Sequence, residues 1–252
     1  MTRYMVVLSY KGTSFHGFQR QPDARTVQGS LEEALATLTG EKVATAGAGR
    51  TDAGVHAAAQ VAAFDLPRRV DEGRWRTSLN ALTPGDMAIV KMAEVQTDFD
   101  PRRDALWREY KYFLLNRTAP SPPLADVCLH YSREMDLTKA RSACDSIKGT
   151  HDFSAFTLSS EKGNTVRDVI ACDIGEVELL DGMLCVTVRA GTFLYRMVRI
   201  LVGAILKVSS GAMDMSDLEL SLSGGTRPCS EPLSPEGLFF WRVEYPREKL
   251  SA

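Results

Sequence analysis

The sequence predicts an α+β protein made of two pseudo-symmetric halves, each with the element order β-α-β-β-α-β. Three observations support this fold class. Several short segments alternate apolar and polar residues with the period of two that is typical of strands, and longer segments repeat apolar residues at the helical spacing. The same order of elements then occurs twice along the 252 residues. With 44% hydrophobic and 25% charged residues, the composition is that of a globular protein with a sizeable core.

The first half, residues 1–104, opens with an alternating strand from Tyr4 to Tyr10. A helix follows, because apolar residues recur at helical spacing from Val27 to Leu38 until Gly40 interrupts them. The remaining expected elements are strands at 43–48 and 57–65, a helix over about 70–82, and a strand at 87–95.

The second half, residues 105–252, repeats this order. The expected elements are a strand at 107–115, a helix around 137–147, strands at 166–177 and 183–190, helices at 193–209 and 216–222, and a last strand at 238–245. In that last strand Phe239, Trp241, Val243 and Tyr245 share one face, which we expect to be buried. Each half thus has the split β-α-β (ferredoxin-like) order, with helices on one side of an antiparallel sheet.

The cysteines and the hydropathy of the sequence indicate the cellular compartment. The five cysteines are an odd number and include no CxxC pair, so neither a disulfide framework nor a zinc site is expected. The N-terminal apolar run is too short for a signal peptide, and the longest later run, Ile200 to Leu206, is far short of a membrane span. We therefore expect a soluble, cytoplasmic protein.

Positive charge gathers in two segments although the formal net charge is −2. Residues 101–117 carry a net charge of +3, and residues 189–207 carry +4 with no acidic residue. This distribution is consistent with one basic face that binds nucleic acid. Scattered solvated charge is the more ordinary explanation of such counts.

The segment GAGRTDAGVHA, Gly47 to Ala57, is the first candidate for chemistry. Its small residues allow close approach of a partner, and it places Asp52 beside Arg50 in the connection between two strands. An arginine nearby favours the charged form of a carboxylate. A turn aspartate that bonds its own backbone is an equally consistent interpretation. The P-loop and dinucleotide-binding patterns fail at required positions, and the four histidines have no metal-ligand spacing.

The segment ALWREYKYFLL is the second candidate. A strand's period of two places Arg108, Tyr110 and Tyr112 on one face. Two aromatic rings and an arginine on a sheet face can stack on and hold a nucleobase. Two tyrosines that face the core are the commoner arrangement.

The segment TFLYRMVRILVGAILK is the third candidate. Its polar residues form a narrow stripe at helical spacing on an otherwise apolar helix: Thr192, Arg196, Arg199, Gly203 and Lys207. A stripe this narrow favours an arginine that points inward at a partner, for which Asp52 is the candidate.

Together these segments resemble the TruA family of tRNA pseudouridine synthases over nearly the whole chain. The resemblance is carried, in order, by YKGTSFHGFQRQPDARTVQGSLEEAL, GRTDAGVHA, LNALTPGDMAI, REYKY, GTHDFSAF, FLYRMVRILVG and SPEGLFFWRVEYP. Phe18 stands where the family usually has Trp. Seven segments in the family's order make the resemblance specific.

The resemblance implies a role for each candidate residue. Asp52 would be the catalytic aspartate, Arg50 would help to hold the target base out of the stack, Tyr110 would pack on that base, and Arg199 would pair with the aspartate. It also implies two α/β halves with the active cleft between them, and a homodimer whose basic surface holds tRNA. The target would be a uridine at position 38, 39 or 40 of the anticodon stem-loop.

Isomerising uridine requires no cofactor, because the bond from C1′ to N1 is replaced by one to C5 without redox change or net hydrolysis. Asp52 must be ionised for this, and Tyr110 is the candidate base for the C5 proton. Two alternatives remain open. The chain could be a non-catalytic tRNA-binding or chaperone module, or a hydrolase, which would need a second carboxylate across the scissile bond.

Overall fold

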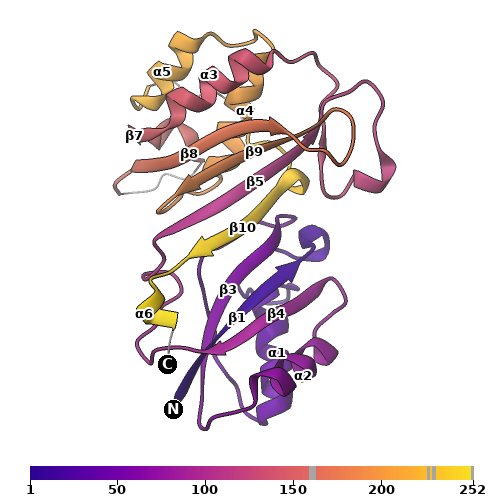
Figure 1. Cartoon of the computed structure of the whole chain (residues 1–252), viewed down its shortest axis with the longest axis vertical. Coiled ribbons are helices and arrows are strands. Elements are labelled where there is room, and N and C mark those ends of the chain that lie inside the picture. The colour runs from indigo at the N-terminus through magenta and orange to yellow at the C-terminus, as the bar shows by residue number, and fades with distance from the viewer. Residues whose placement is uncertain (159–162, 226–227, 229–230, 251–252) are drawn as a thin grey trace. The chain divides into compact units, whose positions relative to one another are not determined.

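The computed structural model describes residues 1–158, 163–225, 228 and 231–250, and the chain divides into two compact units (Figure 1). Unit 1 consists of Met1–Arg108 and Phe239–Ala252, and unit 2 of Glu109–Leu238. Each unit combines helices with strands that pair mostly antiparallel, which confirms the predicted α+β class. In the part of the chain that is described, no helix has the length and apolar character needed to cross a membrane.

The sheet of unit 1 has the strand order β4-β1-β3-β10. Its strands are β1 (Thr2–Tyr10), β3 (His56–Leu66), β4 (Met87–Glu94) and β10 (Leu238–Glu244), and the short β2 (Ala46–Gly47) pairs with β3. β1 lies antiparallel to β3 and β4, whereas β10 runs parallel to β3. Because Tyr10 pairs with Ala57, the end of β1 lies beside the start of β3, where the candidate loop ends.

Two capped helices complete unit 1. In α1 (Val27–Thr39) the Thr26 side chain accepts the Gly29 N–H, and in α2 (Glu72–Leu82) the Asp71 side chain accepts the Arg74 N–H. The side chain of Asn80 bonds both the N–H and the C=O of Ile89, at 2.7 and 3.0 Å, so it fastens α2 to β4. The short elements η1 (Gly12–Ser14) and α6 (Arg247–Leu250) also belong to unit 1.

The sheet of unit 2 has the order β5-β9-β8-β7. Its strands are β5 (Trp107–Leu115), which begins in unit 1, β9 (Met183–Ala190), β8 (Val166–Glu176) and β7 (Gly149–Asp152), with β6 (Leu129–His130) parallel to β5. The helices are α3 (Leu137–Ile147), α4 (Met197–Ser209) and α5 (Met215–Leu222), with the short turns η2 (Pro122–Leu124), η3 (Phe153–Phe156) and η4 (Pro235–Gly237). The three helices pack together over one side of the β8–β9 sheet (Figure 1). Twelve of the thirteen residues of α4 are buried, as expected of a helix that is apolar nearly all round.

The C-terminal strand differs most from the sequence prediction, which has it in the second half, 105–252. In the structure β10 lies with unit 1, because Phe239 and Phe240 pair with His56 and Ala57 of β3. The Tyr245 hydroxyl also donates to the carbonyl of Pro101 at 2.7 Å. The predicted buried face of this strand is wrong over most of its length. Phe240 is fully buried, whereas Phe239, Trp241 and Val243 are only partly buried.

Other elements also differ from the predictions. The predicted strand 43–48 is reduced to the two residues of β2, and β7 is an additional strand. The helix predicted to start at residue 193 starts at Met197, because Arg196 takes a left-handed conformation with φ of 60°. A backbone in that region cannot continue a right-handed helix.

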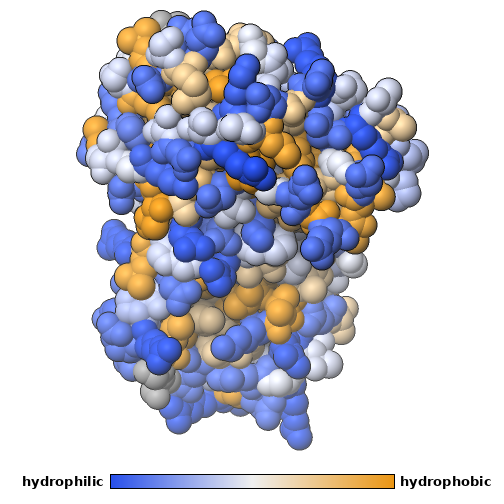
Figure 2. Space-filling view, turned by 45° about the horizontal axis from the view of Figure 1, so that its top comes forward, coloured by the Kyte–Doolittle hydropathy of each residue, from blue (hydrophilic) through white to orange (hydrophobic). Residues whose placement is uncertain are grey.

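Hydrophilic residues cover most of the face drawn in Figure 2, and hydrophobic residues appear there in separate groups. The large hydrophobic side chains that are most exposed, apart from Met1, are Leu179, Leu106, Leu220 and Val90. Single exposed hydrophobic residues are ordinary on a protein surface and indicate no binding site by themselves.

Candidate active site

The candidate loop connects β2 to β3 in unit 1 and runs from Ala48 to Val55. Its tip is a four-residue turn in which the Asp52 carbonyl accepts the Val55 N–H at 3.2 Å. Gly54 has a φ of 79°, a conformation that glycine adopts readily at the third position of such a turn. Arg50 is exposed and Asp52 is partly buried.

The segment around η1 fixes both sides of this turn through backbone bonds. Phe18 N–H donates to the Thr51 carbonyl at 3.1 Å, and Gly54 N–H donates to the Phe15 carbonyl at 3.3 Å. Asp52 lies between these two attachment points. The segment KGTSFHGF therefore serves the loop as a scaffold, a role that sequence reasoning did not assign to it.

Two glycines allow the two segments to approach so closely. A Cβ atom on Gly12 would lie 2.0 Å from the carbonyl oxygen of Val55, and one on Gly17 would lie 2.6 Å from that of Thr51. Both distances are far shorter than any non-bonded contact, so a larger residue cannot be placed there without moving the loop. Gly47 is similarly covered by the ring of Phe18.

Three buried side chains also bond the loop, each from a different strand. The Tyr10 hydroxyl of β1 lies 2.9 Å from the Thr51 hydroxyl, and Gln60 Nε2 of β3 donates to the Gly49 carbonyl at 3.0 Å. Arg108 Nε, at the start of β5, donates to the Ala48 carbonyl at 2.9 Å. Burial raises the pKa of Tyr10 to about 12, so its hydroxyl stays protonated and able to donate.

His56, the third polar residue of the motif, has a structural position. It is fully buried, its Nδ1 accepts the Gly12 N–H at 2.9 Å, and its ring stacks on Phe239 with centroids 4.6 Å apart. An Nδ1 that accepts leaves the proton on Nε2 in the neutral ring. His56 thus ties the scaffold segment and β10 to the end of the loop.

Arg108 and Tyr112, predicted to hold a nucleobase with Tyr110, both donate to backbone carbonyls of the protein. Arg108 is 5% exposed, and besides Ala48 it donates from Nη2 to the Arg102 carbonyl at 2.6 Å. Tyr112 is fully buried in unit 2 and its hydroxyl donates to the Ser234 carbonyl at 2.8 Å. Burial raises the pKa of Tyr112 well above its ordinary value. In this structure both side chains therefore form part of the interior.

Tyr110 retains a little exposure, 8%, and packs edge to face on Phe193 with ring centroids 5.0 Å apart. Arg199 lies on the first turn of α4, is 8% exposed, and its Nε donates to the Leu233 carbonyl. Lys207, two turns further on, donates to the carbonyl of Pro228 at 2.8 Å. Two residues of the predicted polar stripe, Arg199 and Lys207, thus bond backbone carbonyls within unit 2.

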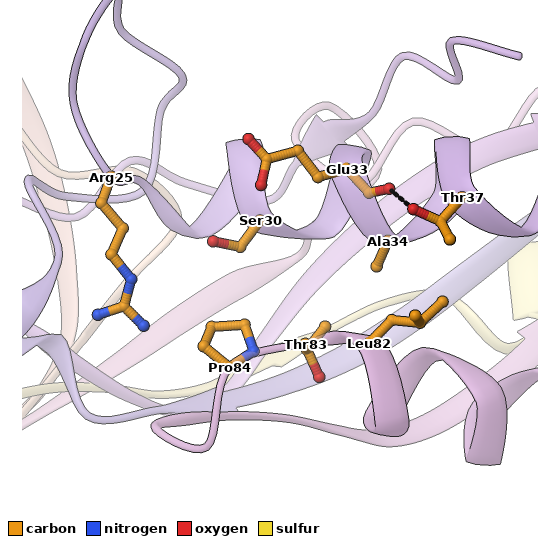
Figure 3. Close-up of a pocket in the computed structure, with 8 residues that line it drawn as sticks. All are labelled: Arg25, Ser30, Glu33, Ala34, Thr37, Leu82, Thr83 and Pro84. Carbon is orange, nitrogen blue, oxygen red and sulfur yellow. Dashed lines mark hydrogen bonds between the residues drawn. The ribbon is translucent and has the colours of Figure 1, made fainter.

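A surface pocket of about 490 Å³ lies elsewhere in unit 1 (Figure 3). It is formed by α1 and by the residues that end α2, and it is lined by Arg25, Ser30, Glu33, Ala34, Thr37, Leu82, Thr83 and Pro84. None of the candidate residues lines it, so we do not assign the chemistry to this pocket. Among the residues that the structure describes, no group of three or more histidine, cysteine or acidic side chains could hold a metal ion.

Sequence reasoning missed Tyr10, Gln60 and the two scaffold glycines. One feature of the sequence could have indicated Tyr10 and Gln60. Each has a polar group at the end of its side chain and stands at a strand position that faces the core. That feature shows that a hydrogen-bond partner is needed but does not show which one.

The chain also matches known proteins over nearly its whole length. A family described as tRNA pseudouridine synthase matches residues 6–103 and 143–246. Proteins named tRNA pseudouridine synthase A are similar to this chain. One from Oceanobacillus iheyensis is 37% identical to it, and the match covers 97% of each chain. Relatives from Listeria monocytogenes serotype 4a and Pseudothermotoga lettingae are 35% and 36% identical, covering 97% of this chain and 100% of theirs.

These matches include the loop around Asp52 and all of α4, which carries Arg199. The seven sequence segments already indicated this likeness. The matches show that it extends over both units. The chain belongs to the tRNA pseudouridine synthase family, whose members are isomerases that convert uridine to pseudouridine.

Proposed function

We propose that this protein isomerises uridine at positions 38, 39 or 40 of the tRNA anticodon stem-loop, with Asp52 as the essential residue. The observation that carries the proposal is the loop itself. Asp52 is partly buried between two backbone attachments, at Thr51 and Gly54, that hold its main chain in place. A fixed backbone of this kind provides the constant geometry that a reacting carboxylate requires.

In the proposed reaction Asp52 acts as an ionised carboxylate. Whether it attacks the sugar, adds to the ring or removes the C2′ proton, the step begins from the ionised form. The bond from C1′ to N1 then breaks, the uracil rotates, C5 bonds to C1′, and the proton on C5 leaves. We propose no cofactor, because these steps balance without an oxidant, a reductant or a net addition of water.

Arg50, exposed beside Asp52, is proposed to hold the space that the flipped base leaves, and Tyr110 to cover the base and accept the C5 proton directly or through water. Arg199 is proposed to balance the charge of the reacting carboxylate. Arg108 is buried and bonds the Ala48 carbonyl, which supports a role for it in holding the loop rather than in touching the base.

Binding of tRNA is proposed to use exposed basic residues of the 101–117 segment, of which Arg102 and Arg103 are exposed in unit 1. Contacts to phosphates release counterions, so affinity should fall steeply with salt. We further propose a homodimer that acts in the cytoplasm. Size measurement by light scattering tests the first of these two statements.

The proposal is tested by tritium release from tRNA that carries 5-³H-uridine, with no metal or cofactor added. Release by the unsubstituted protein but not by Asp52→Ala, followed by chemical mapping of pseudouridine to positions 38–40, is the expected result. A non-catalytic tRNA-binding or chaperone module is the alternative, and it predicts tRNA binding by both proteins with no release from either. Free uracil among the products would indicate a hydrolase.

A further inference from the structure

Three side chains bond the loop at positions next to the candidate residues. The groups held are the Ala48 carbonyl, the Gly49 carbonyl and the Thr51 hydroxyl. The two residues with proposed contacts to RNA, Arg50 and Asp52, alternate with these anchored positions, and both are more exposed than the Thr51 between them. The loop is thus fixed at Ala48 and Gly49 before Arg50, and at Thr51 between Arg50 and Asp52.

The three anchoring side chains are themselves immobilised. Tyr10, Gln60 and Arg108 are 4%, 0% and 5% exposed. Each lies on a strand, and two of them are linked, because Gln60 also bonds the Tyr10 hydroxyl. The Oε1 atom of Gln60 accepts the Val61 N–H at 3.1 Å. A buried polar group keeps its partner strongly, because losing the bond leaves both groups desolvated and unsatisfied.

We propose that Tyr10, Gln60 and Arg108 are positioning residues of the isomerisation: they hold the inner side of the loop so that Asp52 and Arg50 keep one geometry. The inference rests on the proposed function. None of the three residues needs to touch the substrate. A displacement of about 1 Å in a reacting group can lower a rate by about 100-fold, so a small shift of this loop has a large effect on catalysis.

Tyr10→Phe tests the inference, because it removes only the hydroxyl, which bonds Thr51 and Gln60. The chain offers a matched control in Tyr4→Phe. Tyr4 also lies on β1, is 1% exposed, and its hydroxyl accepts the Val70 N–H at 2.9 Å, outside the loop. We expect similar losses of stability from both, but a fall in kcat for tritium release of about 10- to 100-fold only in Tyr10→Phe, with an unchanged KM for tRNA.

A second set of variants approaches the same bond from the loop. Thr51→Val removes the other hydroxyl, and Thr51→Ser retains it. We expect Thr51→Val to lower kcat as much as Tyr10→Phe, Thr51→Ser to restore most of the loss, and the double variant Tyr10→Phe with Thr51→Val to be no worse than either single variant. This set keeps the test decisive if Tyr10→Phe is too unstable to assay.

The outcomes separate this inference from the proposed function. If the unsubstituted protein releases tritium and Tyr10→Phe and Thr51→Val retain its kcat, the anchors are merely structural and the inference is overturned, while the function stands. If both variants lower kcat but Tyr4→Phe lowers it equally, the effect is general destabilisation, and the inference is also overturned. If the unsubstituted protein releases no tritium, the proposed function fails and the inference fails with it.

Discussion

Asp52 in unit 1 and Asp152 in unit 2 both lie in turns, but the two turns are built in opposite ways. At Asp152 the carboxylate holds the turn, because its Oδ1 accepts the Ser154 N–H at 2.9 Å and the Thr165 hydroxyl at 2.6 Å. At Asp52 the turn is held through the backbone and through the neighbour Thr51. A carboxylate that holds its own turn is a structural group, whereas the turn at Asp52 is also held by bonds in which its carboxylate takes no part.

The largest expected effect separates these two aspartates directly. Asp52→Asn should lower tritium release by at least about 1,000-fold, because the amide can neither attack nor accept a proton. The backbone and Thr51 bonds that hold the turn remain in this variant, so its free energy of unfolding should fall less than that of Asp152→Asn. Single-turnover release and urea unfolding measure the two quantities.

Asp152→Asn is the matched control for that experiment. It should retain the rate of release and lose stability instead, since the amide is a poorer acceptor for the two bonds to Oδ1. If Asp152→Asn abolished release while remaining folded, or if Asp52→Asn remained active, the contrast between the two turns would be contradicted.

The next effect concerns the scaffold behind Asp52. Gly12→Ala places a Cβ 2.0 Å from the Val55 carbonyl oxygen, so the scaffold and the loop must separate. We expect a loss of about 2 kcal/mol or more in the free energy of unfolding, as for other overpacked sites, together with a fall in kcat. Gly85→Ala is the control, because its Cβ would meet no atom within 4 Å. Equal stability of the two variants would show that the loop tolerates displacement.

A smaller effect extends the comparison to the tyrosines of β5. Tyr112 donates its hydroxyl to Ser234 and is fully buried, so Tyr112→Phe should cost about 1 kcal/mol of unfolding free energy, the usual net value of such a bond. Tyr110→Phe keeps the ring that packs on Phe193 and should mainly lower kcat. Thermal unfolding and steady-state kinetics on both variants test this division. A larger kcat loss in Tyr112→Phe would reverse the two roles.

The elements were predictable where the residue period is strong. α1 ends before Gly40 as its apolar spacing indicates, and β5 spans 107–115 as predicted. The placement of β10 in unit 1 was not predictable, because a strand's alternation shows which residues share a face but not which strand it will pair with.

The sequence indicated candidate residues for the site but not the side chains that support them. The sequence indicated Asp52 from its loop, and Arg108 from the period of its strand. That period could not tell whether the face of Arg108 meets RNA or the interior, and the structure has it inside, bonded to Ala48. The partnership of Tyr10 with Thr51 depends on the register of β1 with β3, which joins residues far apart in the chain.

The smallest expected effect is the dependence of stability on pH, and it isolates Asp152. The Thr165 hydroxyl, followed by the Ser154 N–H, lowers the pKa of this carboxyl below its ordinary value. The unfolded chain therefore binds the proton first as the solution becomes acidic, so the stability that Asp152 contributes is present above its unfolded pKa of about 3.9 and is lost as the pH falls through its folded pKa. The pKa values of Asp98 and Asp100 are lowered as well, so the unsubstituted protein loses stability from several carboxylates in the same range.

Urea unfolding between about pH 5 and pH 2 should accordingly show a shallower decline of stability in Asp152→Asn than in the unsubstituted protein. Parallel curves would mean that the bonds to Asp152 do not favour its charged form, and the view that its carboxylate holds the turn would then have to be abandoned.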